Sequence, residues 1–206
     1  MDKKIICFLL LIIIICSSIL IYKINKTPEY DEKVYNEVYQ EYENIINPTN
    51  TSNISQSTNG SSKSETIHIY KNSTGNTYRT IAVINIPKIN ISYPVINDYS
   101  EANLKIAPTK FAGPEPNQVG NFVIVGHNNW NKEFFSNLDK LENDDIIELT
   151  DLSGNKISYK VYDKYQIKQN DFSCLNQKTN GKIELTLITC VKHQKNKRLI
   201  VKCIAN

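Results

Sequence analysis

Short apolar, β-branched runs alternate with polar turn residues along the C-terminal part of the chain. Eight such runs are typical of β-strands: residues 66–70, 80–86, 91–96, 121–126, 145–150, 156–162, 183–189 and 198–204. Helical spacing is confined to two short pieces, residues 100–106 and 131–141, the second with aromatic and leucine side chains on one face. The pattern predicts a mainly β fold, and eight strands in about 140 residues indicate a closed or nearly closed barrel.

A long apolar run stands at the start of the sequence. Residues 5–22 are nearly uninterrupted apolar residues behind Lys3 and Lys4, and about 18 such residues can cross a bilayer as a helix. A cleaved signal peptide is the alternative, but the run is long for one and no A-x-A-like cleavage site follows it. We therefore expect a short tail over residues 1–4 and an uncleaved transmembrane anchor over residues 5–22. Lysines flank both ends of the span, so charge alone leaves its orientation open.

Two further segments precede the strand-rich part of the chain. Apolar residues from Tyr30 to Ile45 recur at spacings of three and four and predict a stalk helix, either solvated or docked on the domain. The following segment is rich in Ser, Thr and Asn and holds too few apolar residues to offset the entropy lost on ordering. We assign residues 23–66 to the stalk helix and a flexible linker, and residues 67–206 to one folded domain.

The charge of the chain narrows the range of partners. The formal net charge is +3, with 24 basic residues interspersed among 21 acidic ones. A nucleic-acid-binding domain usually concentrates its basic residues on one face or in one segment. Nucleic acid is therefore not an expected partner.

The cysteines predict a free thiol in the folded domain. Two of the five cysteines lie in the predicted anchor, which leaves Cys174, Cys190 and Cys203 in the domain. An odd number cannot all pair within one chain, although a bridge between Cys174 and Cys203 is conceivable. No CxxC pair and no Cys/His cluster suggests a zinc site.

Cys190 ends an apolar run in a way that indicates a nucleophile. Alternation over residues 184–190 places Cys190 on the same strand face as Thr186 and Ile188. A polar turn follows, and Arg198 opens the next strand, so the two residues can lie side by side if the strands are antiparallel neighbours. A guanidinium group favours a neighbouring thiolate and offers planar donors to a carbonyl oxygen that is gaining charge.

A nucleophilic cysteine needs a proton carrier, and the chain has three histidines: His68, His127 and His193. His127 follows a buried-looking strand, where a side chain on a loop can be held rigidly. His193 lies in a lysine-rich turn typical of exposed residues, and His68 alternates with isoleucines in a first strand and is expected to face outward. We therefore select His127. A single cysteine in a β-strand is more often a small buried apolar residue. The hypothesis of a nucleophilic cysteine therefore depends on the combination of Cys190 with Arg198 and His127.

The candidate residues lie in motifs that resemble a known family. "TLITC", which ends at Cys190, the arginine of "RLIV" and "VIVGH", which ends at His127, together resemble the signature of the sortases, cell-surface transpeptidases of Gram-positive bacteria. "IAVINIPKINISYPVI", "SEANLKIAP", "GPEPNQVGNFVIVGHN" and "FFSNLDKLENDDIIEL" resemble further sortase segments in the same order. The resemblance covers roughly residues 79–204.

The resemblance implies a fold and a set of site residues. The fold would be a closed eight-stranded sortase-type β-barrel with short helices, preceded by an N-terminal transmembrane helix. The catalytic residues would be His127, Cys190 and Arg198. Thr189 matches a position that helps to shape the oxyanion site.

Two departures from the family pattern bear on the class of sortase. Asn128 and Asn129 follow the histidine where many members carry a charged residue. The stretch between His127 and Cys190 is short for the helical insertion of class B, which favours a compact class A, D or E type. No acidic cluster carries over the calcium site of some relatives, so we expect no cofactor, while a calcium requirement stays open.

The function implied by the resemblance is transpeptidation at the cell surface. The cysteine would cleave a C-terminal LPxTG-like sorting signal, form a thioacyl enzyme and pass the surface protein to an amine of a cell-wall precursor or a pilin. The enzyme would lie in the cell membrane with its N-terminus cytoplasmic and its catalytic domain outside. Recognition loops such as residues 167–181 are expected to decide the motif. A thiol hydrolase on the same scaffold and a non-catalytic, membrane-tethered binding module are the alternatives.

Overall fold

The structure is a computed structural model that describes residues 70–71, 77–128 and 133–206. The predicted tail (1–4), anchor (5–22) and stalk and linker (23–66) lie outside the described residues, as does His68. Within the described ranges, no helix has the length and apolar character needed to cross a membrane.

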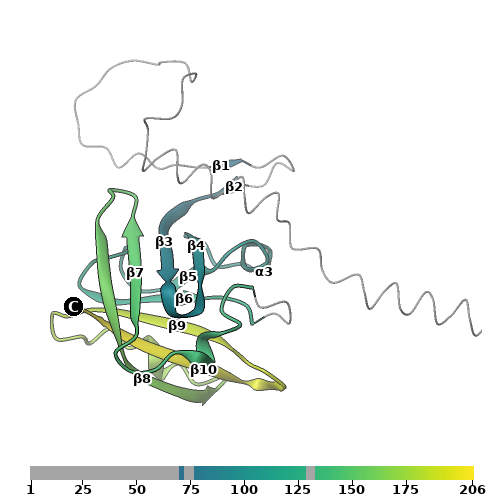
Figure 1. The fold of residues 1–206 in the computed structure, drawn as a ribbon. Coiled ribbons are helices and arrows are strands. Elements are labelled where there is room, and N and C mark those ends of the chain that lie inside the picture. Colours follow the sequence, from purple (N-terminus) through teal and green to yellow (C-terminus); the bar gives the residue numbers. More distant parts are fainter. Residues whose placement is uncertain (1–69, 72–76, 129–132) are drawn as a thin grey trace, which may run out of the picture. The chain divides into compact units, whose positions relative to one another are not determined.

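Eight strands close into a barrel, in the order β10-β8-β7-β3-β4-β5-β6-β9 (Figure 1). They are β3 (Thr80–Ile86), β4 (Ile91–Ile96), β5 (Thr109–Ala112), β6 (Gly120–Val125), β7 (Ile146–Asp151), β8 (Lys156–Lys168), β9 (Ile183–Val191) and β10 (Gln194–Ala205). The pairs β4–β5 and β6–β9 are parallel, and the other pairs are antiparallel. The prediction of a mainly β, eight-stranded barrel is confirmed.

One predicted barrel strand is replaced by another. Of the predicted run 66–70, the structure describes only Tyr70, which lies in β1 (Tyr70–Lys71) and pairs with β2 (Thr77–Tyr78) in a separate two-stranded sheet. The barrel instead contains β5, whose sequence TKFA has no apolar run to mark it. This short strand forms because β4 and β6 supply pairing partners on its two sides, which is a tertiary effect rather than a local propensity.

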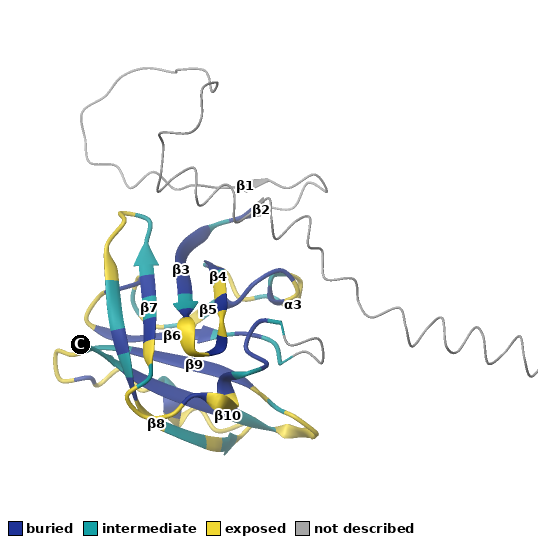
Figure 2. Cartoon of the chain, in the orientation of Figure 1, coloured by how far each residue is buried: buried dark blue, intermediate teal, exposed yellow. Residues whose placement is uncertain are grey.

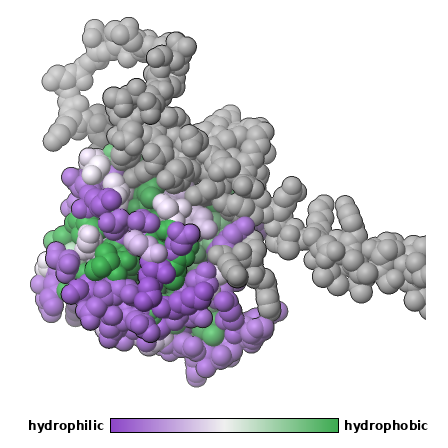
Figure 3. Space-filling model, in the orientation of Figure 1, coloured by the Kyte–Doolittle hydropathy of each residue, from purple (hydrophilic) through white to green (hydrophobic). Residues whose placement is uncertain are grey.

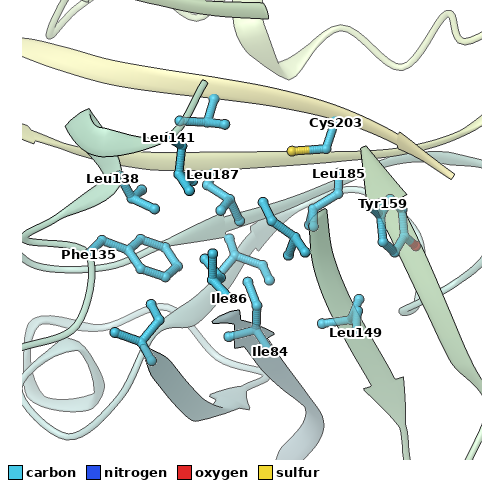
Figure 4. Packing of buried hydrophobic residues seen from close by; sticks show 14 of the residues in the cluster. Ile84, Ile86, Phe135, Leu138, Leu141, Leu149, Tyr159, Leu185, Leu187 and Cys203 are labelled. Atoms are coloured by element: carbon cyan, nitrogen blue, oxygen red, sulfur yellow. The ribbon is translucent and has the colours of Figure 1, made fainter. Parts of the chain in front are cut away.

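Alternate residues of the strands point into the barrel and form one apolar core (Figures 2 and 4). Its labelled members in Figure 4 are Ile84, Ile86, Phe135, Leu138, Leu141, Leu149, Tyr159, Leu185, Leu187 and Cys203. Strands β9 and β10 are therefore buried on their inner face along most of their length. This core fixes the two strands that carry Cys190 and Arg198.

The helical elements are short. Helix α3 (Glu101–Leu104) lies within the predicted piece 100–106, and Ser100 caps it by accepting a hydrogen bond from the backbone N–H of Asn103 at 3.0 Å. The second predicted piece, 131–141, contains only the 3₁₀ turn η3 (Leu138–Lys140) among its described residues. The other 3₁₀ turns in the described ranges are η2 (Pro87–Ile89) and η4 (Ser173–Leu175).

The β9–β10 hairpin is longer than the sequence pattern indicates. Strand β10 begins at Gln194, so only Lys192 and His193 form the turn, and the polar segment expected to be a loop is mostly strand. The pairing register shifts between Gln194 and Arg198, which is a β-bulge. In Figure 1 the hairpin tip projects on the opposite side of the barrel from the C-terminus.

Candidate active site

The ends of β6 and β9 lie side by side and carry two of the candidate residues. The parallel pairing of these strands runs as far as Val125 opposite Ile188. The backbone N–H of Gly126 then donates to the Ile188 carbonyl at 3.1 Å, which continues the ladder past the strand end. Extending this register by two residues brings His127 level with Cys190 on the outer face of the barrel.

Arg198 completes the group from the neighbouring strand. It pairs directly with Cys190 in the antiparallel β9–β10 ladder, as the sequence analysis expected. Cys190 is exposed, whereas Arg198 and His127 are half-buried. The fold therefore brings the three predicted catalytic residues to one place, with the thiol accessible to solvent and substrate.

Two side-chain hydrogen bonds fasten the histidine segment to the cysteine strand. The Thr189 hydroxyl donates to the Gly126 carbonyl at 2.8 Å, and the Asn128 side-chain amide donates to the Cys190 carbonyl at 2.7 Å. These bonds flank His127 and Cys190 and fix their relative position. Sequence analysis noted Asn128 only as a departure from the family pattern, and no periodicity reveals its partner.

Thr189 has a different environment from Cys190. Its side chain is 1% exposed and lies on the strand face opposite the thiol, where its hydroxyl holds Gly126. Its proposed part in the oxyanion site stays a prediction. The contact in the structure gives this residue a role in positioning the segment before His127.

The bulge in β10 orients the guanidinium group of Arg198. Nη1 donates to the carbonyl oxygens of Lys195 and Lys197, at 3.0 Å each. A guanidinium has five N–H donors, so further donors stay available for an oxyanion. The extended hairpin thus provides a rigid support for the arginine that a flexible loop would not.

His127 is surrounded so that its neutral form is favoured. Partial burial lowers the pKa of its imidazole, the Glu101 carboxylate of α3 opposes this shift, and Lys105 adds to it. The unfolded chain therefore takes up a proton below about pH 6.5 before the native imidazole does. His127 accordingly contributes stability above that pH, and this contribution is lost as the pH falls towards the native pKa.

Charge variants at the start and end of α3 are expected to move the His127 pKa in opposite directions. Glu101→Gln removes the group that raises this pKa and should lower it further, whereas Lys105→Gln should raise it. Titration of the His127 ring carbons by NMR at low salt measures both shifts. Both differences should narrow at high salt, because exposed charges are screened. Shifts of the same sign in the two variants would contradict this assignment.

Gly126 allows the chain to pass close to the core just before His127. A Cβ atom at this position would lie 2.7 Å from Cδ2 of Phe135, a ring that is 0% exposed and has no room to move outward. The Phe135 N–H also donates to the His127 carbonyl at 3.0 Å, so a shift of this ring displaces the histidine segment.

We expect Gly126→Ala to cost about 1–3 kcal/mol in the free energy of unfolding, because it overpacks the core, and to reduce activity as well. Chemical denaturation and steady-state kinetics measure the two effects. The double variant Gly126→Ala/Phe135→Leu is the control: if the clash is the cause, the smaller side chain restores part of the lost stability. Additive losses in the double variant would exclude the clash.

An apolar pocket of about 200 Å³ opens beside Arg198. Its lining comes from the segment before α3, from β5, β6, β8, β9 and β10, and from the loop after β8: Tyr99, Phe111, Val125, Ile167, Gln169, Asp171, Phe172, Cys174, Leu175, Ile188 and Arg198. The aromatic rings at its rim are partly exposed, and those of Tyr99 and Phe111 stack edge to face with centroids 5.1 Å apart. A peptide bound in this pocket would lie beside Arg198, the residue that pairs with Cys190.

The other two described cysteines and His193 are poorly placed for catalysis. Cys174 and Cys203 are buried and unbridged, and burial raises the pKa of both thiols. His193 lies exposed at the hairpin tip, beyond Cys190. The described residues contain no group of three or more His, Cys, Asp or Glu side chains that could hold a metal ion.

An exposed cysteine held between an arginine and a histidine on a closed barrel defines a cysteine enzyme of the β-barrel type. A family model described as "Sortase domain" matches residues 84–205, which span most of this barrel and all three candidate residues. The chain belongs to the sortase family.

Individual relatives agree with this assignment. The chain is 33% identical over 128 residues to "Sortase A" of Bacillus anthracis, an alignment that covers 60% of this chain and 58% of that protein. The structure resembles that of a Clostridium perfringens Sortase D5 transpeptidase with a TM-score of 0.56 and 30% identity, over 62% of this chain and 79% of the other. It also resembles sortase C-1 from Actinomyces oris, with a TM-score of 0.56 and 26% identity over 61% and 71% of the two chains.

These three relatives are described as sortases A, D and C, and the chain is about equally similar to each of them. The class of this sortase is therefore not distinguished. The prediction of a compact class A, D or E type stays a prediction. The alignment with the Bacillus anthracis protein spans less than two thirds of its length, so the family is assigned here from the barrel domain alone.

Proposed function

We propose that this protein is a cysteine transpeptidase that cleaves a C-terminal LPxTG-like sorting signal and transfers the surface protein to an amine acceptor. The observation that carries the proposal is the exposed Cys190 thiol, paired in register with Arg198 and level with His127. This arrangement supplies a nucleophile, an oxyanion donor and a proton carrier in one place.

In the first half-reaction the Cys190 thiolate attacks the carbonyl carbon of the scissile peptide bond. The carbonyl oxygen becomes an oxyanion, which accepts hydrogen bonds from the Arg198 guanidinium. The C–N bond then breaks, and the His127 imidazolium gives its proton to the departing amine. The product is a thioester between Cys190 and the substrate.

In the second half-reaction His127, now neutral, takes a proton from the incoming amine. The amine nitrogen attacks the thioester carbon and expels the thiolate, which restores the enzyme. Burial lowers the pKa of His127 and so favours the neutral imidazole that this step needs as a base. Slow turnover is the expected consequence, because the first half-reaction needs the imidazolium.

The apolar pocket receives the apolar part of the sorting signal. Its lining by Ile188, Leu175 and partly exposed aromatic residues suits an aliphatic side chain, and its position beside Arg198 suits a residue upstream of the scissile bond. The acceptor is an amine of a cell-wall precursor or a pilin.

The chain acts at the outer face of the cell membrane. The support is the apolar run at residues 5–22, whose length suits a transmembrane helix, together with substrates that lie outside the cell. The three side chains supply every group that the two steps need, so we expect no cofactor in the chemistry, and a structural calcium requirement stays open.

The test is to incubate the purified full-length chain with a panel of sorting peptides, with and without an added amine, and to identify the products by mass spectrometry. A peptide–amine conjugate supports transpeptidation. Hydrolysed peptide alone, even at high amine concentration, would instead indicate a thiol hydrolase. Absence of any product and of any thioacyl adduct would indicate a binding module.

A further inference from the structure

The loop between β8 and β9, residues 169–182, forms one side of the apolar pocket. It contributes Gln169, Asp171, Phe172, Cys174 and Leu175 to the lining. Its regular secondary structure is limited to the 3₁₀ turn η4. A loop of this kind has no ladder of its own, so side-chain contacts must hold it in place.

Two carboxamide side chains join this loop to β6. The Gln177 Oε1 atom accepts from the Asn121 backbone N–H at 3.1 Å, and Gln177 Nε2 donates to the Asn121 carbonyl at 3.0 Å. In return, Asn121 Nδ2 donates to the loop carbonyls of Cys174 at 2.9 Å and Asn176 at 3.2 Å. We call this pair of residues the amide clamp.

The clamp occupies a gap in the barrel ladder. The pairing of β5 with β6 extends from Val125 to Val123 and does not reach Asn121. The Gln177 carboxamide therefore satisfies the backbone groups of Asn121 that a longer β5 would have paired. Gln177 Nε2 also donates to the Leu175 carbonyl at 3.0 Å, which ties the clamp to the pocket lining.

A buried polar chain fixes the orientation of Asn121. Its Oδ1 atom accepts from the Thr186 hydroxyl at 2.6 Å, and the same hydroxyl accepts from the Lys202 ammonium at 2.8 Å. Lys202 also lies 3.5 Å from a Glu184 carboxylate oxygen. Asn121 and Thr186 are 0% exposed. The amide nitrogen of Asn121 must then face the loop, because its oxygen is already committed to Thr186.

We propose that Asn121 and Gln177 are positioning residues for substrate selection: the amide clamp holds the loop in its pocket-forming geometry before the sorting peptide binds. This inference rests on the proposed function only in identifying the occupant of the pocket as the peptide. When the pocket is already formed, peptide binding does not have to order the loop, and the binding free energy is not reduced by the entropy lost in that ordering. Loss of the clamp lowers the fraction of molecules with a competent pocket and raises the apparent dissociation constant in proportion.

The test uses Gln177→Ala in the full-length chain, with Lys178→Ala as the matched control. Both side chains are exposed, but in the described part of the chain that of Lys178 makes no hydrogen bond or ion pair. The peptide KM of Gln177→Ala should rise by about tenfold, while kcat at saturating peptide stays within about twofold. Lys178→Ala should match the wild type. A fall in kcat at unchanged KM, or unchanged kinetics in Gln177→Ala, would overturn the proposal.

A second measurement needs no substrate. Hydrogen exchange of the peptide-free protein should show protection across residues 173–177 that Gln177→Ala loses and Lys178→Ala keeps. If the wild-type loop exchanges as fast as a free peptide, no preformed pocket exists and the inference fails. Since this readout is independent of turnover, it separates failure of the clamp from failure of the proposed function.

Discussion

Cys190→Ala is expected to lower turnover by more than about a thousandfold and to abolish the thioacyl adduct, because no other described group is placed to act as the nucleophile. The thiol lies at a strand end, exposed, with Arg198 directly opposite. Peptide cleavage assays and intact-mass spectrometry after substrate addition measure the two losses. Peptide binding should persist in this variant, since the pocket is untouched.

The other two described cysteines provide the control. Cys203 is 0% exposed within the barrel core (Figure 4), and Cys203→Ala should cost about 1 kcal/mol in stability without loss of the adduct. Cys174→Ala should likewise keep the adduct, although it alters the pocket wall. A thiol reagent should modify Cys190 alone among these three in the folded protein. Equal loss of the adduct in all three variants would assign Cys190 a structural role.

Arg198→Lys is expected to lower kcat/KM on the order of a hundredfold although the positive charge is kept. An ammonium group on a flexible stem cannot reproduce a planar group that binds two hairpin carbonyls and an oxyanion at once. Steady-state kinetics with a cleavable sorting peptide measures the effect, and the loss should fall mainly on kcat.

Lys197→Ala is the matched control for Arg198→Lys. It removes a neighbouring positive charge, but only the backbone carbonyl of Lys197 contacts the guanidinium group. Its kinetics should stay close to those of the wild type. If Arg198→Lys were nearly as active as the wild type, the arginine would act as a point charge and the oxyanion role would be wrong.

In Figure 3 the described part of the visible face is largely hydrophilic, with hydrophobic residues gathered in smaller areas. The proposed recognition of the peptide assigns this task to the apolar pocket, whose lining includes three exposed aromatic residues, Tyr99, Phe111 and Phe172. These residues come from separate loops and strands, and no sequence spacing relates them.

The sequence by itself determined the features that depend on local periodicity. Alternation of apolar residues predicted most of the barrel strands and placed Cys190 at the end of one of them, on the same face as Thr186 and Ile188. The apolar run before Gly126 placed His127 at the end of another. The sequence allowed Cys190 and Arg198 to lie side by side if their strands were antiparallel neighbours, and the structure confirms that they pair.

Only the tertiary structure decided the features that depend on contacts between distant segments. Strand β5 lacks an apolar pattern, and its place in the barrel comes from its neighbours. The parallel pairing of β6 with β9, which brings His127 level with Cys190, joins segments separated by β7 and β8. The Asn128 side-chain amide donates to the Cys190 carbonyl, 62 residues later in the sequence, and the hydrogen bonds between Asn121 and Gln177 join residues that are 56 positions apart. A periodic pattern records which face a side chain occupies, whereas a hydrogen-bond partner at such separations is fixed only when the barrel closes.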